Sequence, residues 1–333
     1  MADQQQDPSG EDALIARYFK PLATDPGAFG LLDDAAALDA RGEDIVVTTD
    51  AIVEGVHYLP DDPPDTVSRK ALRVNLSDLA AKGATPAGFV LTLALRRAEE
   101  QWLAEFARGL AEDANLFGCP LLGGDTVSTP GPAMISITAF GRAPRGAMVH
   151  RSGAKPGDHI MVTGTIGDAT LGLDILRGGA VAAVLTDDEA ARAFLIGRYH
   201  VPQPRNALAL AVRDHASAAM DVSDGLAGDL AKLCAASGVS AVVDAPSIPI
   251  SDAGAAALAR GVAGIERLVS GGDDYEILCA VPEARAGSLA LAAQRAGVAL
   301  TTIGQVIAGT GAPRFLDARG DDITLARLSY SHF

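Results

Sequence analysis

Hydrophobic and polar positions divide the first half of the chain into alternating strands and helices. The run from Ile45 to Thr49 is rich in β-branched residues and predicts a strand that ends at Asp50. Apolar residues recur at helical spacing from Thr66 to Lys82, and the glycine that follows predicts the end of that helix. By the same criteria, the other elements expected in this half are helices over residues 11–20 and 99–117 and strands over residues 89–95, 120–122 and 134–140.

The second half continues this alternation with a different composition. Strands are predicted over residues 159–163, 218–221, 239–244, 276–280 and 300–303, separated by helices rich in alanine and leucine. The alternation favours an α/β domain. The stretch from Arg145 to Gly157, rich in glycine and basic residues, is the best candidate for a domain boundary. We therefore expect a disordered tail at residues 1–10, an N-terminal domain at 11–148 and a C-terminal α/β domain at 149–333.

Composition and charge narrow the possible functions. The chain has 333 residues, of which 48% are hydrophobic, so it can bury a substantial core, and its length favours two domains. Its 27 basic and 42 acidic residues give a net charge of -15, which disfavours a nucleic-acid partner held by phosphate neutralisation. An acidic protein that binds nucleotides must place divalent cations between its carboxylates and the phosphates.

The cysteines and the apolar runs argue against several other classes of protein. Cys119, Cys234 and Cys279 form no C-x-x-C pair, which disfavours both a disulfide framework and a zinc site. The clearest apolar run falls far short of the roughly 20 residues that a membrane span requires. The polar start of the chain also lacks the hydrophobic region of a signal peptide. We therefore expect a soluble, cytoplasmic protein.

Aspartates are the candidate functional residues. Asp50, Asp125 and Asp221 each follow an apolar, strand-like segment, and the ends of strands are where open sheets place their ligands. Glycines precede Asp125 and Asp273, which predicts loops where backbone amides can approach a phosphate. Any single aspartate in such a place is more often a turn or helix-cap residue. The chain lacks the G-x-x-x-x-G-K-[ST], G-x-G-x-x-G and H-R-D motifs, so the common nucleotide-binding frameworks do not apply.

Taken together and in order, a set of short segments resembles the motifs of the thiamine-monophosphate kinase family. These segments are residues 32–34, 48–50, 75–80, 83–86, 123–125, 151–158, 221–225 and 270–276. Their order and spacing agree from about Leu14 to the C-terminal His332-Phe333. The family shares a superfamily with aminoimidazole ribonucleotide synthetase and selenophosphate synthetase. The latter normally needs a reactive cysteine near its N-terminal glycine-rich loop, whereas the first cysteine here is Cys119.

The resemblance implies a fold and a reaction. The fold is an α+β N-terminal domain that forms a dimeric β-barrel interface, followed by an α/β C-terminal domain, as in aminoimidazole ribonucleotide synthetase-like proteins. The N-terminal domain would bind ATP and Mg2+ and form a homodimer. The reaction would convert ATP and thiamine monophosphate to ADP and thiamine diphosphate by direct in-line transfer. The alternatives are another ATP-dependent superfamily member, such as aminoimidazole ribonucleotide synthetase, and a non-catalytic metal- or nucleotide-binding protein.

The resemblance also implies roles for individual residues. The expected Mg2+ ligands are Asp34, Thr48, Thr49, Asp50, Asp78, Asp125, Asp221 and Asp224. The residues expected at ATP are Gly124, Asp125, Arg151 and Ser223, and those expected at thiamine monophosphate are His57, Asp273 and Tyr330. A phosphate monoester has its second pKa near 6 and is mostly ionised at neutral pH, so no acid-base residue is expected. Arg151 and the metals would stabilise charge.

Two positions depart from the family pattern. Leu32 stands where the family's Gly-x-Gly-Asp-Asp motif has its second glycine, next to the expected ligand Asp34. Asp273 stands where the family frequently has glutamate, and its shorter side chain is expected to change a substrate contact.

Overall fold

The computed structural model describes residues 14–31, 36 and 38–329. Contacts within the chain group it into two compact units. The first unit comprises residues 1–75 and 86–142, and the second comprises residues 76–85 and 143–333. The expected tail at residues 1–10 lies outside the described residues.

The first unit is built on a sheet with two long helices. Where the structure describes this unit, four strands pair in the order β1-β4-β2-β3, and β2 and β3 run parallel. Its strands are β1 (Asp44–Val53), β2 (Thr85–Leu95), β3 (Leu121–Ser128) and β4 (Met134–Ala143). Its helices are the short η1 (Ile15–Phe19), η2 (Lys20–Leu22) and η3 (Pro26–Leu31) and the long α2 (Pro64–Ala81) and α3 (Glu100–Leu116). The last turns of α2, from residue 76 onward, belong to the second unit.

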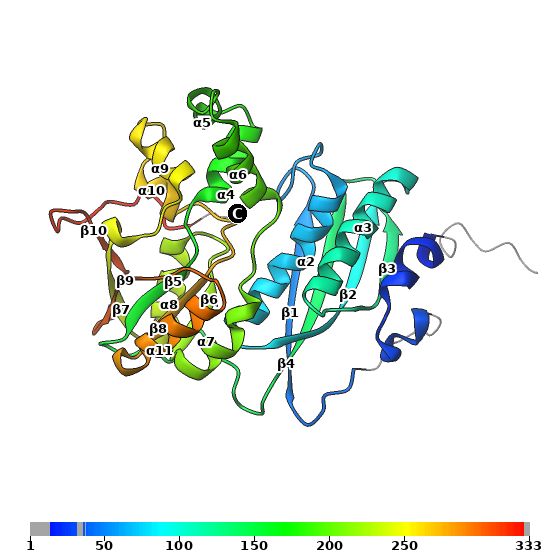
Figure 1. Ribbon diagram of the computed structural model, residues 1–333, viewed down its shortest axis with the longest axis horizontal. Helices are drawn as coiled ribbons and strands as arrows, with labels where there is room; N and C mark the ends of the chain where they lie inside the picture. The colour runs from blue at the N-terminus through cyan, green and yellow to red at the C-terminus, as the bar shows by residue number, and fades with distance from the viewer. Residues whose placement is uncertain (1–13, 32–35, 37, 330–333) are drawn as a thin grey trace, which may run out of the picture. The chain divides into compact units, whose positions relative to one another are not determined.

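One face of this sheet is covered by α2 and α3 (Figure 1). Successive side chains of a strand point to opposite faces, and β4 alternates accordingly: Ile135, Ile137 and Ala139 are fully buried, whereas the residues between them are partly exposed. The two helices are joined by a buried ion pair in which Arg73 binds both carboxylate oxygens of Asp113 at 2.5 and 2.8 Å. The helical face is therefore the core of the first unit.

The prediction that the first strand ends at Asp50 is wrong. β1 continues to Val53, because Ile52 and Val53 carry on the β-branched pattern and an exposed aspartate can occupy the surface of a strand without ending it. The helix expected at residues 11–20 is described from residue 14 onward. There it takes the form of a π-helical turn followed by the 3₁₀ turn η2.

The prediction that Gly123-Gly124-Asp125 forms a loop is also wrong, because these residues lie inside β3. Gly124 pairs with Leu91 of β2, and a Cβ at Gly124 would overlap the Leu91 carbonyl oxygen. The glycine is thus required by the close approach of the neighbouring strand. Such long-range pairing is not visible in the local sequence.

The second unit contains a larger sheet between helices. Within the described residues, six strands pair in the order β10-β7-β9-β5-β8-β6. The strands are β5 (His159–Thr163), β6 (Ala218–Asp221), β7 (Ser240–Asp244), β8 (Ile277–Val281), β9 (Leu300–Ile307) and β10 (Arg314–Leu316). The helices are α4 (Asp168–Leu176), α5 (Ala180–Val184), α6 (Glu189–His200), η4 (Asn206–Leu208), α7 (Ala209–His215), α8 (Leu226–Ser237), η5 (Ala245–Ser247), α9 (Asp252–Ala259), α10 (Ile265–Val269) and α11 (Glu283–Arg295).

The five predicted strands of this unit are confirmed, but their pairing could not be inferred from their order. Among the described strands, the pairs β5–β8, β5–β9, β6–β8 and β7–β9 are antiparallel, and β7–β10 is parallel. The alternation of helices and strands therefore yields a mixed sheet and not the parallel sheet that such alternation often indicates. The short strand β10 was not predicted.

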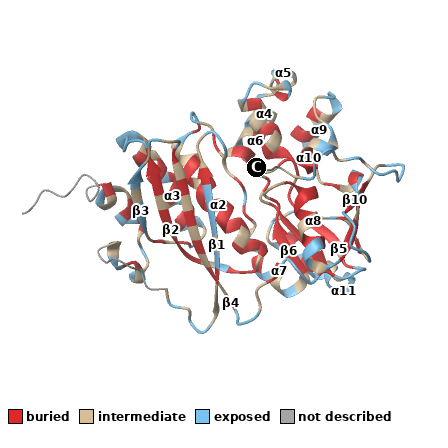
Figure 2. Cartoon of the chain, turned by 180° about the vertical axis from the view of Figure 1, so that it is seen from behind, coloured by how far each residue is buried: buried red, intermediate tan, exposed pale blue. Residues whose placement is uncertain are grey.

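Both faces of the second sheet are buried. Ile160 and Val162 of β5 pack with α8 residues in one apolar cluster, whereas Met161 between them packs with residues of α7 and α11 in another. A third cluster joins α4, α5, α6 and α9. Figure 2 shows β5, β6 and β8 as almost continuously buried. The second unit is therefore a layered structure with its own core.

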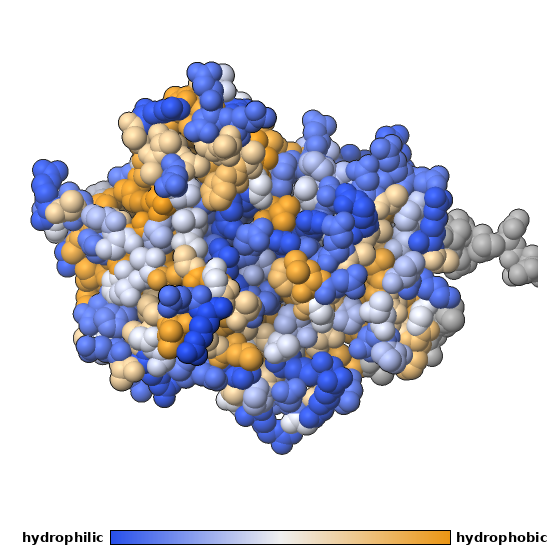
Figure 3. Space-filling view, in the orientation of Figure 1, coloured by the Kyte–Doolittle hydropathy of each residue, from blue (hydrophilic) through white to orange (hydrophobic). Residues whose placement is uncertain are grey.

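The surface carries scattered apolar residues. On the face drawn in Figure 3, hydrophobic residues gather over the helical cluster around α4 and α5, amid hydrophilic side chains. Among the described helices, we find none with the length and apolar character needed to cross a membrane.

Candidate functional site

Three consecutive expected metal ligands lie on β1, in the first unit. Because side chains alternate along a strand, Thr48 and Asp50 point to the face opposite that of Thr49. Thr49 Oγ1 donates to the Ile137 carbonyl at 3.2 Å and accepts from Thr138 Oγ1 at 2.9 Å. Side chains from Thr48 and Asp50 can share one site, whereas Thr49 faces the other side of the sheet.

The expected ATP-binding residues Gly124 and Asp125 line a cavity of the first unit. The cavity measures about 430 Å3, a size typical of small-molecule pockets. Most of its lining is apolar, and Phe19, Leu93 and Leu122 belong to it. Asp125 is exposed, and its Oδ1 accepts a hydrogen bond from the backbone N of Thr126 at 2.9 Å. A cavity lined by both apolar side chains and a carboxylate suits a ligand that has both a ring system and charged groups.

His57, an expected substrate residue, lies in the turn after β1. Its Nδ1 accepts a hydrogen bond from the backbone N of Val53 at 3.0 Å, and its carbonyl oxygen accepts one from Lys70 Nζ at 2.9 Å. These bonds fix the turn and the orientation of the imidazole ring.

In the second unit, charged groups surround Lys82, which directly follows α2. Its ammonium donates to the Ala219 carbonyl of β6 at 2.7 Å. Burial lowers the pKa of Lys82 and the Arg151 guanidinium lowers it further, whereas the carboxylates of Asp78 and Asp221 raise it. Two expected metal ligands and the expected ATP-binding arginine therefore lie close enough to the same ammonium to interact with it. No sequence motif identified Lys82. Its position four residues after Asp78 in a helical pattern could have indicated that the two side chains lie close together.

The loop after β6 carries Ser223 and Asp224 and is fixed by Asp229 of α8. The Asp229 side chain is fully buried, and its Oδ2 accepts hydrogen bonds from the backbone N of Ser223 and of Asp224, both at 3.0 Å. Burial raises the pKa of Asp229. A carboxylate in the first turn of the helix that follows a Ser-Asp loop was the signal that could have identified this residue.

Lys232 lies beside the same loop and pairs with both carboxylates. Its Nζ donates to Asp224 at 2.6 Å and to Asp229 at 2.8 Å. Burial lowers the pKa of Lys232, but the hydrogen bonds to Asp224 and Asp229 outweigh this effect and raise it. Asp224 is thus held close to a cation, as expected for a carboxylate at a site that gathers negative charge.

The expected substrate residue Asp273 lies in a segment that hydrogen-bonds to this loop. The backbone N of Asp273 donates to the Ser223 carbonyl, and that of Tyr275 donates to the Val222 carbonyl, both at 2.8 Å. Gly272 allows this approach, because a Cβ there would lie 2.5 Å from the Ser223 oxygen. The predicted loop at residues 271–274 is confirmed, and it lies against the loop that carries Ser223 and Asp224.

Asp274, beside Asp273, points into the interior. Its two carboxylate oxygens accept hydrogen bonds from the backbone N of Gly167 at 2.9 and 3.0 Å. Burial raises the pKa of Asp274 well above its usual range, because the charged form loses its hydration.

We predict that Asp274→Asn changes how stability depends on pH. Folding raises the pKa of this carboxyl group above its ordinary value of 3.8. The stabilisation that results is fully present at a pH below 3.8 and is lost as the pH rises through the raised pKa. The neutral amide should therefore make the variant more stable than the wild type at about pH 8, and the difference should shrink toward about pH 4, with a limiting slope of about 1.4 kcal/mol per pH unit. Urea unfolding across this range measures it. A difference that is independent of pH contradicts the prediction.

Asp34, Tyr330 and the unusual Leu32 lie outside the described residues. Among the residues that the structure does describe, no group of three or more His, Cys, Asp or Glu side chains is arranged to hold a metal ion. The expected ligands Thr48, Asp50 and Asp125 belong to the first unit, and Asp78, Asp221 and Asp224 belong to the second.

Comparisons with known proteins agree over nearly the whole chain. The family models for AIR synthase related protein, N-terminal domain and C-terminal domain, match residues 32–143 and 155–315. A thiamine-monophosphate kinase of Caulobacter vibrioides is 46% identical over 331 residues, 98% of this chain and 91% of that protein. The crystal structure of the thiamine-monophosphate kinase from Stenotrophomonas maltophilia is 37% identical, with a TM-score of 0.80 over 94% of this chain and 96% of that one. A structure described as AaThiL complexed with AMPPCP and TMP is 29% identical, with a TM-score of 0.75 over 92% and 97%.

Proposed function

The chain belongs to the thiamine-monophosphate kinase family of AIR synthase related proteins, and on this premise we propose that it transfers the γ-phosphoryl group of ATP to thiamine monophosphate. The products are ADP and thiamine diphosphate. The observation that carries the proposal is the 46% identity with a thiamine-monophosphate kinase over 98% of the chain. The AaThiL structure, which holds AMPPCP and TMP, supports the same pair of substrates.

The contacts of the second unit support this assignment. The segment with Asp273, the expected substrate residue, is hydrogen-bonded through its backbone to the loop with Ser223, the expected ATP residue. A phosphoryl transfer requires donor and acceptor to be held in a fixed relation, and two loops joined by short backbone bonds provide such a relation. A similar adjacency holds for Arg151, Asp78 and Asp221, which all act on the pKa of Lys82.

The chemistry of the expected metal ligands fits Mg2+. The expected ligands Asp34, Thr48, Thr49, Asp50, Asp78, Asp125, Asp221 and Asp224 offer only oxygen donors, which hard divalent cations prefer. The Thr49 side chain, however, lies on the face of β1 opposite Thr48 and Asp50 and is bonded to Ile137 and Thr138. The ammonium groups of Lys82 and Lys232 lie near Asp78, Asp221 and Asp224, so these carboxylates already attract cations. Bound Mg2+ supplies charge neutralisation of the phosphates. The part of this chain is to hold the carboxylates in place, as Asp229 does for Asp224.

No general base is needed for the proposed transfer. The second pKa of a phosphate monoester lies near 6, so the attacking oxygen is already mostly ionised at neutral pH. The barrier is instead the repulsion between two anionic phosphates. Arg151 is exposed and can reach a ligand, and its guanidinium is suited to bind phosphate oxygens while His57 and Asp273 orient the acceptor.

A coupled assay for ADP tests the proposal. Release of ADP should require thiamine monophosphate in addition to ATP and Mg2+, and omission of any one of them should reduce the rate to background. A phosphatase with the same carboxylates would release ADP from ATP without thiamine monophosphate, and that result would refute the kinase assignment.

We also propose that the first unit pairs with its copy in a homodimer that closes a β-barrel. By the alternation of their strands, Val47 and Val127 lie on the sheet face opposite α2 and α3, and these residues are 56% and 43% exposed. Thr49 and Thr138 lie on the same open face. An apolar and hydroxyl-bearing sheet face of this kind is stabilised by a second sheet. Sedimentation equilibrium should give the mass of two chains, and the mass of one chain at micromolar concentration would contradict the proposal.

A further inference from the structure

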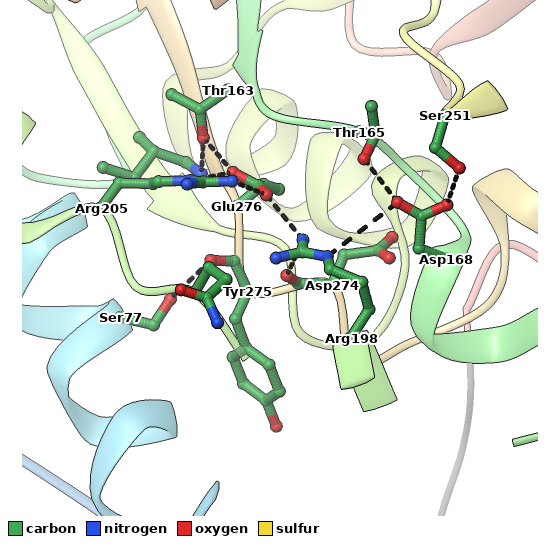
Figure 4. A network of polar contacts seen from close by, with 12 residues as sticks. Ser77, Thr163, Thr165, Asp168, Arg198, Arg205, Ser251, Asp274, Tyr275 and Glu276 are labelled. Atoms are coloured by element: carbon green, nitrogen blue, oxygen red, sulfur yellow. Dashed lines mark hydrogen bonds and ion pairs between the residues drawn. The ribbon is translucent and has the colours of Figure 1, made fainter. Parts of the chain in front are cut away.

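A buried charge network in the second unit is centred on Glu276. The Glu276 carboxylate is fully buried and accepts hydrogen bonds from Arg198 at 2.7 Å, from Arg205 at 2.6 and 2.5 Å, and from Thr163 at 2.7 Å (Figure 4). The two arginines lie at the end of α6 and just beyond it. A bidentate pair with a second guanidinium fixes a carboxylate in position and direction.

Further hydrogen bonds join this network to the residues next to Glu276 in the sequence. Arg198 also donates to the Asp274 carbonyl at 3.3 Å, and the Val222 backbone N donates to the Glu276 carbonyl at 2.8 Å. Ser77, next to the expected metal ligand Asp78, donates to the Tyr275 carbonyl at 3.4 Å. The network therefore holds the chain just after Asp273 from several directions.

The segment so held has an unfavourable backbone conformation. Asp273 and Tyr275 have φ values of 72° and 51°, in the left-handed region that side chains other than glycine rarely adopt. Each such residue is strained and persists only when the surrounding structure enforces its conformation. The bonds to Glu276 and Asp274 act here together with the backbone bonds that Asp273 and Tyr275 make to Ser223 and Val222.

This backbone conformation determines the direction in which successive side chains point. Asp274 and Glu276 point into the interior, whereas Asp273 and Tyr275 are partly exposed. Tyr275 Oη donates to Asp273 Oδ1 at 3.3 Å, so the aromatic ring and the carboxylate are presented together. A paired ring and carboxylate suit a cationic aromatic group, since both attract positive charge.

We propose that Glu276, Arg198 and Arg205 are positioning residues that hold Asp273 and Tyr275 in the orientation needed to bind the cationic heteroaromatic part of the phosphoryl acceptor. This inference rests on the proposed function, which identifies the phosphoryl acceptor as thiamine monophosphate. The charge network does not touch the acceptor. It acts through the left-handed segment between Asp273 and Tyr275.

The test combines two variants with a matched control. Arg205→Lys keeps the charge but removes the bidentate geometry, and Glu276→Gln removes the charge that both arginines share. The control is Arg73→Lys, the same substitution in the buried bidentate pair with Asp113 in the first unit. Initial rates give KM for each substrate and kcat, and calorimetry measures the binding of thiamine monophosphate alone.

We expect Arg205→Lys to raise KM for thiamine monophosphate and its dissociation constant by about 10-fold, with kcat and KM for ATP within about twofold of wild type. Glu276→Gln should do the same more strongly, and Arg73→Lys should lower thermal stability without this selective change. If Glu276→Gln fails to fold, Arg205→Lys decides alone. Unchanged affinity for thiamine monophosphate in a folded Arg205→Lys variant, or the same change in Arg73→Lys, would overturn the inference.

An incorrect kinase assignment and an incorrect positioning role give different experimental results. Wild-type protein that forms no thiamine diphosphate overturns the kinase assignment. Calorimetry on the wild type and on Arg205→Lys then still decides the positioning role, and wild-type protein that binds no thiamine monophosphate overturns the inference as well.

Discussion

Asp78→Asn is expected to lower kcat/KM for the kinase reaction by about 1,000-fold, equivalent to about 4 kcal/mol of lost transition-state stabilisation. Asp78 lies near the end of α2, where its carboxylate, that of Asp221 and the Arg151 guanidinium all act on Lys82. The amide keeps the shape of the side chain but removes the charge that a divalent cation requires. Steady-state rates at a series of Mg2+ concentrations measure the effect, and we expect the half-saturating concentration to rise.

A second aspartate on the same helix provides the control. Asp65 lies in the first turn of α2 and pairs with Arg108 at 3.1 Å. Asp65→Asn should leave kcat/KM within about threefold of wild type, because a partly exposed ion pair contributes little to stability and Asp65 is not among the expected site residues. Normal turnover of Asp78→Asn at limiting Mg2+ would show that Asp78 does not bind the metal.

Asp113→Ala is expected to destabilise the protein by about 3–5 kcal/mol, because it leaves the buried guanidinium of Arg73 without its partner. The pair is almost completely buried, with 5% and 2% of the side chains of Arg73 and Asp113 exposed. The midpoint of thermal or urea unfolding measures the loss.

Two comparisons show whether the uncompensated charge is the cause. Asp322→Ala breaks an ion pair of the same bidentate geometry, formed with Arg314 at 2.9 and 3.0 Å on the surface, and should change the midpoint little. Combining Arg73→Met with Asp113→Leu removes both charges and should recover much of the lost stability. A midpoint of Asp113→Ala equal to that of wild type would contradict the account.

The strands of the second unit could be predicted because their signal is local. His159–Thr163 and Ala218–Asp221 are found at the predicted residues, since each is a short apolar run bounded by polar or turn-forming residues. β10 was missed because it has only three residues and exists by pairing with β7. Local pattern identifies a buried strand but not its neighbour.

Two errors in the first unit have one cause. Asp50 and Gly124 are residue types that usually mark turns, yet both lie inside strands. At Gly124 the decisive contact is with Leu91, a residue of another strand. At both positions, strand pairing between segments that are distant in sequence outweighs the turn propensity of the residue.

The positions of candidate site residues in the fold could be predicted where these residues belong to compact motifs. Asp221, Ser223 and Asp224 follow a predicted strand, and the structure places them at its end and in the loop beyond. The supporting residues were not predictable in this way. Glu276 binds Arg198 and Arg205, which are 78 and 71 positions away in the sequence. Only the folded chain brings these charges together.

The most direct test of the central claim is chromatographic detection of the product. The purified protein is incubated with ATP, Mg2+ and thiamine monophosphate, and the thiamine compounds are separated. The account predicts that thiamine diphosphate accumulates in a one-to-one ratio with ADP and that none forms without the protein. Consumption of ATP with thiamine monophosphate left unchanged would contradict it.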